Sequence, residues 1–231
     1  EDGVPRTLTT KPTSTDAYDD TARAANRGKT SASARAGKDD TLALSVWLGA
    51  MRVSKSVYGY RKRAKSGKLL EMVELERPLP PHEYETRGVW LDPPVQLRDA
   101  LVRCGHHYSR GGLHAVEHLL VTLAPVVIAC DSADLGCQCT RRKGDEHADR
   151  LLLFEKRRGG VGVVEALQPR FRALMDAALA RLEGCECAAG CPSCIMMSGC
   201  GEYNEGLDKM AGGAILRSLL LGGAMDDSKP S

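Results

Sequence analysis

The sequence predicts an α+β fold in which a small antiparallel β region packs with several helices and a cysteine-rich loop. Apolar and alternating segments of strand length occupy much of the first half of the chain, and long amphipathic segments occupy the second. Five of the nine cysteines lie between positions 185 and 200. The chain has 231 residues, enough for one domain with a substantial core. Because only 4% of the residues are aromatic, that core must be aliphatic.

The β region is expected to cover residues 41–92. An apolar segment at 42–48 predicts the first strand, and rough alternation at 53–60 predicts the second. The segment 69–75 is expected to return as a partner strand, and 86–91 to form a further short strand before two prolines.

The helical part is expected to cover residues 95–222, with helices at 95–104, 113–130, 164–183 and 207–221. The second of these has the clearest pattern, because its apolar residues recur every three or four positions and form one stripe. That stripe consists of Leu113, Val116, Leu120, Leu123 and Val127. Pro125 should kink this helix or mark its final turn.

Between these helices the chain has three further features. An apolar strand is expected at 151–154, followed by a tight glycine turn at 159–162. The polar connection 131–149 carries Cys137 and Cys139.

The two ends of the chain differ from the middle. Residues 1–40 are rich in Thr, Ser, Ala, Asp, Lys and Arg, and have too few large apolar residues to offset the entropy of ordering. We expect this segment to be disordered and the tail 223–231 to be frayed. The chain starts at Glu1 and not at Met, which favours a fragment or a processed product.

The cysteine cluster predicts a structural zinc site with one ion. Zinc is held by four thiolate or imidazole ligands at about 2.0–2.3 Å, and short turns between the ligands provide this geometry. Cys191 and Cys194 form a C-x-x-C turn, and Cys185 and Cys187 form a second close pair. These four cysteines are the most compact set, and Cys200 is the alternative ligand. An all-thiolate site is closed to water, so the metal should stabilise the fold and perform no chemistry.

Two disulfides and a spare thiol are the alternative interpretation of the cluster. Disulfides need an oxidising compartment, and the N-terminus has no pattern of a signal peptide. No run of about 18 apolar residues occurs either, so no membrane-spanning helix is expected. These observations favour metal binding inside the cell.

A basic segment with two tyrosines is the candidate nucleic-acid contact. Seven positive charges precede the first acid after position 51, and Tyr58 and Tyr60 lie among them on one strand face. Cations beside exposed rings can hold a single strand through phosphate contacts and base stacking. The expected contact residues are Tyr58, Tyr60, Arg61, Lys62 and Arg63. A solvated hairpin with ordinary surface charge is the alternative.

An H-x-x-E-H pattern is the strongest indication of an enzyme. His114 and His118 share a helix face and could bind zinc, with Glu117 as general base, as in an inverted-motif metalloprotease. The pattern is short, however, and no third ligand is recognisable downstream. Ordinary buried helix histidines are the alternative. Cys137 and Cys139 with His147, and Cys104 with His106 and His107, are weaker metal candidates of the same kind.

The cysteine loop, followed by Gly201, Asn204 and Leu207-Asp208-Lys209, resembles the MrfA-like zinc-binding domain. That domain forms the C-terminus of Hrq/MrfA-type helicases, which are superfamily-two DNA helicases related to the RecQ4-like group. Further matching motifs lie at 57–62, 84–91, 112–120, 130–136 and 159–162. The resemblance covers about residues 45–222 and treats His114 and His118 as helix residues, not as protease ligands.

The resemblance implies a parent protein that unwinds DNA in the 3′-to-5′ direction with ATP and acts in DNA repair. Its implied zinc ligands are Cys185, Cys187, Cys191 and Cys194, and its implied partners are single-stranded or forked DNA and the RecA-like motor lobes of the same parent. The insert-like stretch 137–149 departs from the family pattern, and residues 1–40 have no counterpart that we identify. The implied location is intracellular, and nuclear if the source is eukaryotic.

The chain lacks the sequence elements of the helicase motor. Gly28-Lys29-Thr30 resembles the end of a phosphate loop, but position 23, where the first glycine belongs, is Arg23. A chain of this length also cannot hold two motor lobes beside the zinc module. We therefore expect an accessory domain that binds DNA or braces the motor and does not hydrolyse ATP. A stand-alone zinc-stabilised interaction module is the second hypothesis.

Overall fold

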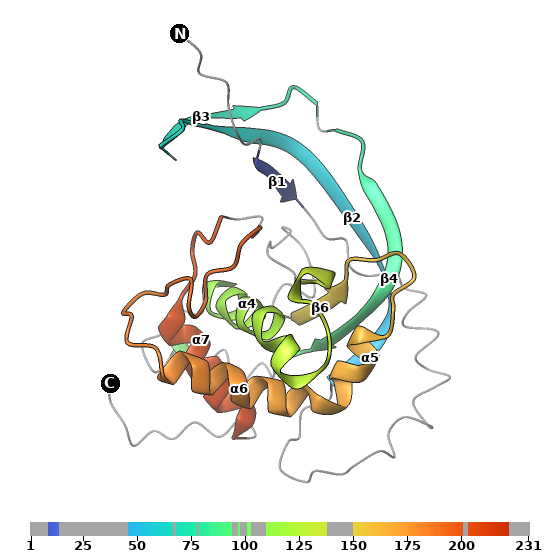
Figure 1. The fold of residues 1–231 in the computed structure, drawn as a ribbon, viewed down its shortest axis with the longest axis vertical. Helices are drawn as coiled ribbons and strands as arrows, with labels where there is room; N and C mark the ends of the chain where they lie inside the picture. Colours follow the sequence, from blue (N-terminus) through green and yellow to red (C-terminus); the bar gives the residue numbers. More distant parts are fainter. Residues whose placement is uncertain are drawn as a thin grey trace.

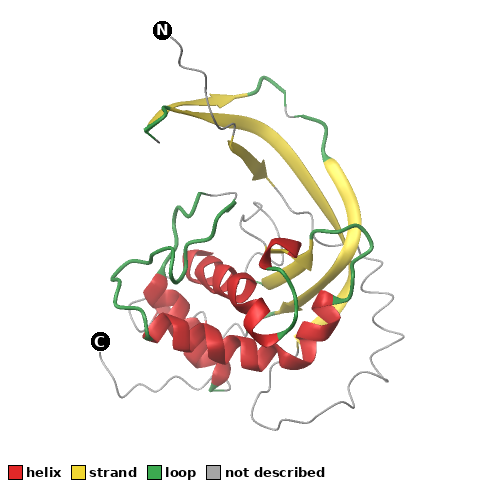
Figure 2. Ribbon diagram, viewed as in Figure 1, coloured by secondary structure: helices red, strands yellow, loops and turns green. Residues whose placement is uncertain are grey.

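A strongly curved antiparallel sheet bends around a group of helices in the computed structural model (Figures 1 and 2). The structure describes residues 9–13, 46–66, 68–77, 79–93, 97, 101–102, 110–137, 150–200 and 203–221. Its elements in chain order are β1 (Thr9–Thr13), β2 (Val46–Arg63), β3 (Leu69–Glu74), β4 (His82–Leu91), α4 (Arg110–Val127), η1 (Ser132–Asp134), β5 (Leu135–Cys137), β6 (Leu151–Glu155), α5 (Val163–Leu167), η2 (Gln168–Arg170), α6 (Phe171–Glu183) and α7 (Lys209–Leu220). The predicted α+β class is confirmed.

Strand β2 is a single element of 18 residues, so the prediction of two separate strands at 42–48 and 53–60 is wrong within its described part. The glycine between them, Gly49, pairs with Gly88 of β4 and does not interrupt the strand. A Cβ atom at Gly49 would lie 2.8 Å from the Trp90 side chain. The glycine is therefore present to admit the indole, and not to form a turn.

The first half of β2 pairs with β4, and its second half pairs with both β1 and β3. Tyr60 faces Thr10 on β1 and Val73 on β3, so these two strands lie on opposite edges of β2. Strand β1 corrects the expectation that all of residues 1–40 are disordered. It gains main-chain hydrogen bonds along an edge of β2, and three of its five residues are threonines, which suit a strand. The rest of that segment lies outside the described residues.

The body of the sheet continues from β4 to β6 and then to β5. All five residues of β6 are buried, as expected for a central strand covered on both faces. Strand β5 lies in the connection that the sequence indicated only as polar, because three residues are too few to show a period. Gly136 of β5 lies against the Phe154 ring, where a Cβ atom would be 2.6 Å from Cζ.

The helices follow the predicted pattern with one break. Helix α4 confirms the amphipathic segment predicted at 113–130, and Pro125 lies near its end. The segment predicted as one helix at 164–183 is divided into α5 and α6 by η2, which contains Pro169. Proline lacks the amide hydrogen that an uninterrupted helix needs at that position. The helix predicted at 95–104 lies mostly outside the described residues.

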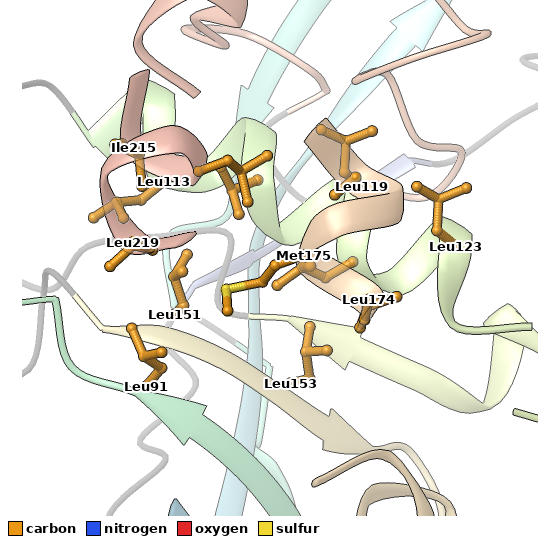
Figure 3. Packing of buried hydrophobic residues seen from close by; sticks show 14 of the residues in the cluster. Leu91, Leu113, Leu119, Leu123, Leu151, Leu153, Leu174, Met175, Ile215 and Leu219 are labelled. Atoms are coloured by element: carbon orange, nitrogen blue, oxygen red, sulfur yellow. The ribbon is translucent and has the colours of Figure 1, made fainter. Parts of the chain in front are cut away.

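The main core fills the space between one face of the sheet and helices α4, α6 and α7 (Figure 3). Its labelled members are Leu91, Leu113, Leu119, Leu123, Leu151, Leu153, Leu174, Met175, Ile215 and Leu219. Burial of each such side chain stabilises the fold by about 1.5–3 kcal/mol relative to exposure. A smaller cluster on the other sheet face contains Met51, Val53, Tyr84, Trp90, Leu152 and Phe154. The core is aliphatic for the most part, as the composition predicts.

Helices α4 and α7 approach each other closely at glycine and alanine. A Cβ atom at Gly112 would lie 2.8 Å from the Cβ of Ala211. The amide of Asp208, the N-cap of α7, donates to the carbonyl of Gly111 at 3.2 Å. Helix α7 is thereby fixed on α4, and the loop between α6 and α7 is held against the same helix.

Among the described residues, no helix combines the length and the apolarity needed to cross a membrane.

Candidate metal centre

Four cysteine side chains converge in the loop that joins α6 to α7. The Sγ–Sγ distances are 3.5 Å for Cys185–Cys187, 3.6 Å for Cys185–Cys191, 3.5 Å for Cys187–Cys194 and 3.7 Å for Cys191–Cys194. A zinc ion with four thiolates at about 2.3 Å requires sulfur atoms about 3.8 Å apart. The four thiols thus have the spacing of a tetrahedral zinc site.

The loop backbone brings the thiols together through short turns. The amide of Cys194 donates to the carbonyl of Cys191 at 3.0 Å, and the amide of Met196 donates to the same oxygen at 3.1 Å. Gly190 has a φ of 113°, and a Cβ atom there would collide with the Ile195 side chain. Gly199 has a φ of 78°. Both glycines therefore supply a left-handed backbone conformation that the turns of the loop require and that other residues rarely adopt.

Protonation of the cluster must change when a cation binds. Burial raises the pKa of the Cys194 thiol, which favours its protonated form when no metal ion is bound. Zinc binding then releases the remaining protons, because the metal ligand is the thiolate.

Lys209, the first residue of α7, supports the cluster and was not singled out as a site residue by sequence reasoning. Its Nζ donates to the carbonyl oxygens of Cys185 and Cys187, each at 2.6 Å, and lies 3.5 Å from the Cys187 sulfur. The ammonium group therefore offsets part of the negative charge of a tetrathiolate site and fixes the first turn of the loop. Only its position within the Leu207-Asp208-Lys209 motif could have drawn attention to it.

Cys200, the alternative zinc ligand, lies away from the four thiols and faces helix α4. Its Sγ is 3.4 Å from Nε2 of His114. One ring nitrogen of His114, one of His118 and the Cys200 sulfur all lie within 4.8 Å of one another. All three residues are buried, and burial lowers the pKa of His114, which favours its neutral form. The structure thus separates five clustered cysteines into a group of four and a single thiol beside two histidines.

Glu117 points away from these histidines, which argues against a metalloprotease. Its Oε2 accepts from Arg110 at 2.8 Å, and its Oε1 accepts from the amide of Leu152 at 3.1 Å. Burial raises its pKa to about 7 in spite of the nearby Arg110 guanidinium. A general base must reach a metal-bound water, but this carboxylate is fully buried and fastens α4 to β6.

A tight turn after the cysteine loop returns the chain to the same region. Tyr203 and Asn204 have φ values of 58° and 61°. The Asn204 side chain accepts from the amide of Met197 at 2.9 Å and donates to its carbonyl at 3.0 Å. The two hydrogen bonds between Asn204 and Met197 hold this strained turn against the end of the cysteine loop.

The five residues expected to contact nucleic acid have different surroundings. Arg61 is 7% exposed and pairs with Glu205 at 3.0 Å, while its Cζ lies 3.5 Å from the centre of the Tyr203 ring. Lys62 pairs with Glu71 at 2.7 Å. Tyr60, Lys62 and Arg63 are half-buried. The side chain of Tyr58 lies outside the described residues, as do Cys104, His106, His107, Cys139 and His147.

The fold and the thiol cluster define an α+β domain built around a structural metal centre. The family model of the MrfA Zn-binding domain matches residues 116–195. An uncharacterized protein of Methanocaldococcus jannaschii is 34% identical over 111 residues, which cover 47% of this chain and 99% of that protein. The chain belongs to the MrfA zinc-binding domain family, and its cofactor is a structural zinc ion.

Two longer relatives are helicases. The ATP-dependent helicase Hrq1 of Schizosaccharomyces pombe is 27% identical over 191 residues, and that of Saccharomyces cerevisiae is 25% identical over 193 residues. These matches cover 76% and 79% of this chain, but the chain spans only 18% of either helicase. The crystal structure of the helicase MrfA bound to DNA aligns with a TM-score of 0.44 and 20% identity, over 77% of this chain and 25% of that one.

Proposed function

We propose that this chain is the zinc-binding accessory domain of an ATP-dependent 3′-to-5′ DNA helicase that acts in DNA repair. In this proposal it contacts single-stranded or forked DNA next to the motor lobes and has no ATPase activity of its own. The matches to two ATP-dependent helicases over more than three quarters of the chain support it. An intracellular location, nuclear in a eukaryote, follows from the same proposal.

In the zinc site we assign the ligands as Cys185, Cys187, Cys191 and Cys194. The sulfur spacing of 3.5–3.7 Å supports this set. Four thiolates fill the coordination sphere of zinc, so the ion has no open position for a substrate. Its role is to fix the loop between α6 and α7.

The DNA contact is assigned to the end of the β2–β3 hairpin, defined here as residues 62–68. Lys65 and Lys68 are exposed there, and the turn is closed by a hydrogen bond from the Ala64 amide to the Lys68 carbonyl at 2.9 Å. Lys62 lies beside them, with its Nζ 5.9 Å from the Tyr60 ring centre. Exposed lysines suit a phosphate backbone, and the half-buried Tyr60 ring beside Lys62 offers a surface for base stacking. These exposed lysines are the observation that carries the DNA part of the proposal.

A salt titration of DNA binding tests this contact. The full 231-residue chain is mixed with a labelled single strand, and fluorescence anisotropy gives the dissociation constant at several salt concentrations. In the Lys65→Glu/Lys68→Glu variant we expect weaker binding and a slope of log K against log salt that is shallower by about 1.4, the value for two lost phosphate contacts.

The matched control is Lys156→Glu/Arg181→Glu, which changes net charge equally at two exposed residues outside the hairpin. The control should retain most of the affinity. An equal loss in both variants would show a nonspecific charge effect and would remove the hairpin end from the proposal. A chain that holds zinc but binds no DNA would favour the interaction module.

Bracing of a motor lobe is a second candidate role, favoured by apolar side chains on β3. Leu69, Leu70 and Met72 are 41%, 64% and 54% exposed. Three large apolar side chains so close together on an exposed strand are typical of an interface. We assign their partner as a RecA-like motor lobe of the parent helicase. Leu70→Ser/Met72→Ser should weaken association with a separately purified motor fragment in calorimetry, whereas Val126→Ser, at a 72% exposed position on α4, should not.

A further inference from the structure

A second group of metal-binding side chains lies beside the zinc loop and has no role in the function proposed above. It consists of His114 and His118 on α4 and Cys200 on the segment between the zinc loop and α7. Their exposed fractions are 3%, 0% and 5%. Two imidazoles and a thiol, each from the preferred ligand types for zinc, thus meet in the interior of the domain.

The geometry of this group fits a metal ion. The ligand atoms lie within 4.8 Å of one another, and the Cys200 sulfur is 3.4 Å from Nε2 of His114. Ligands of one zinc ion, with bonds of about 2.0–2.3 Å, lie about 3.3–3.8 Å apart in a tetrahedron. The two ring centres are 4.3 Å apart, and the rings meet edge to face at 70°.

The surroundings of His118 also match those of a metal ligand. Its Nδ1 lies 2.8 Å from the carbonyl oxygen of Ile195, which fixes the tautomer with hydrogen on Nδ1 and a lone pair on Nε2. Histidines that bind metals commonly donate their second ring nitrogen to a carbonyl oxygen in this way. Ile195 follows Cys194 directly, so the zinc loop itself orients this imidazole.

We propose that His114, His118 and Cys200 form a second metal site for a transition-metal ion of the zinc type. The ion fastens helix α4 to the segment that follows the zinc loop. A mixed nitrogen and sulfur donor set selects zinc or a similarly soft divalent ion over calcium or magnesium. The buried position makes the site structural.

The proposal differs from the metalloprotease hypothesis in its third ligand and in Glu117. The third ligand is a thiolate, and Glu117 is held by Arg110 and the Leu152 amide. The carboxylate therefore cannot activate a water on this ion, and no peptidase activity is expected.

Metal content of the full chain, measured by mass spectrometry after purification without chelators, tests the proposal. We expect two zinc ions per wild-type chain and one in Cys200→Ser and in His114→Gln. Cys130→Ser, which changes a half-buried thiol outside both clusters, should retain two. One zinc in the wild-type chain would overturn the second site and leave His114 and Cys200 as a hydrogen-bonded pair.

Cobalt replacement gives a second, spectroscopic readout of the same site. The wild-type chain, stripped of metal and titrated with Co²⁺, should take up two equivalents with different spectra. Cys200→Ser should lower the sulfur-to-cobalt charge-transfer absorbance by about a fifth, because one of five thiolates is lost. Saturation at one equivalent, or full absorbance in Cys200→Ser, would contradict the proposal. Neither result depends on whether the domain binds DNA.

Discussion

The guanidinium group of Arg61 lies over the ring of Tyr203, with 3.5 Å between Cζ and the ring centre. Arg61 is near the far end of β2, and Tyr203 is in the turn that follows the zinc loop. The same guanidinium pairs with Glu205 at 3.0 Å. This contact joins the curved sheet to the metal-binding segment, so the two parts stabilise each other although they are distant in sequence.

Arg61→Ala should therefore lower stability more than it lowers DNA affinity. Loss of the stacked cation and of its packing should reduce the free energy of unfolding by about 1–3 kcal/mol. Arg61→Lys should recover only part of this, because an ammonium group cannot stack as a planar guanidinium does. Denaturant unfolding followed by circular dichroism measures the difference.

Lys62→Ala is the matched control, since its pair with Glu71 is exposed and should contribute little. If Arg61→Ala unfolded like the wild-type chain while its DNA affinity fell, Arg61 would be a nucleic-acid contact after all, as the sequence alone suggested.

Lys209→Met should weaken zinc binding and leave the fold intact. The change removes the donor to the Cys185 and Cys187 carbonyls and the positive charge beside the thiolates. Loss of such a supporting group commonly lowers metal affinity by about 10–100-fold. Competition with a chromophoric chelator gives the affinity. Arg217→Met, on the same helix but in an exposed pair with Glu183, should change it little; an equal effect would show that general charge, and not the Lys209 contacts, matters.

Glu117→Leu should destabilise the domain by about 3–5 kcal/mol, because it leaves the Arg110 charge and the Leu152 amide without their partner inside the protein. Glu117→Gln should cost less, since an amide oxygen can still accept from Leu152. The Arg110→Met/Glu117→Leu double variant should regain part of the loss. Thermal unfolding of the wild type, Arg110→Met, Glu117→Leu and the double variant forms a double-mutant cycle, and simple additivity would contradict a coupled pair.

The parts of the fold that the sequence predicts well are those whose patterns are long or strongly apolar. Helix α4 is recognisable from apolar residues at a fixed period, and strand β6 from a continuous apolar run. The continuity of β2 cannot be predicted from the local sequence, because the role of Gly49 depends on Trp90 of the neighbouring strand. Strand β5 is too short for any period to appear.

In the candidate site, too, the features that depend on local spacing are predictable from the sequence, and those that depend on distant contacts are not. Spacing favours Cys185, Cys187, Cys191 and Cys194 as the most compact set, because short turns bring them together locally, but it leaves Cys200 as an alternative. The position of Cys200 beside His114 cannot be predicted from the sequence, because the two residues are 86 positions apart and only the packing of α4 brings them together. Arg61 has the sequence context of an exposed cation, but Tyr203 and Glu205 cover it. Contacts between distant segments leave no local pattern to read.

Removal of zinc should loosen the region between α6 and α7 before it affects the sheet. Helices α6 and α7 are joined by the zinc loop, whereas β2, β4 and β6 are held by their own ladder of hydrogen bonds and by the core. Hydrogen exchange on the chain with and without a strong chelator should show faster exchange at 184–208 and in the first turn of α7. Cys191→Ser/Cys194→Ser should reproduce this pattern and lower the melting temperature. Equal exchange rates at 184–208 with and without the chelator would mean that the metal does not stabilise the loop. An unchanged melting curve in the double variant would mean the same.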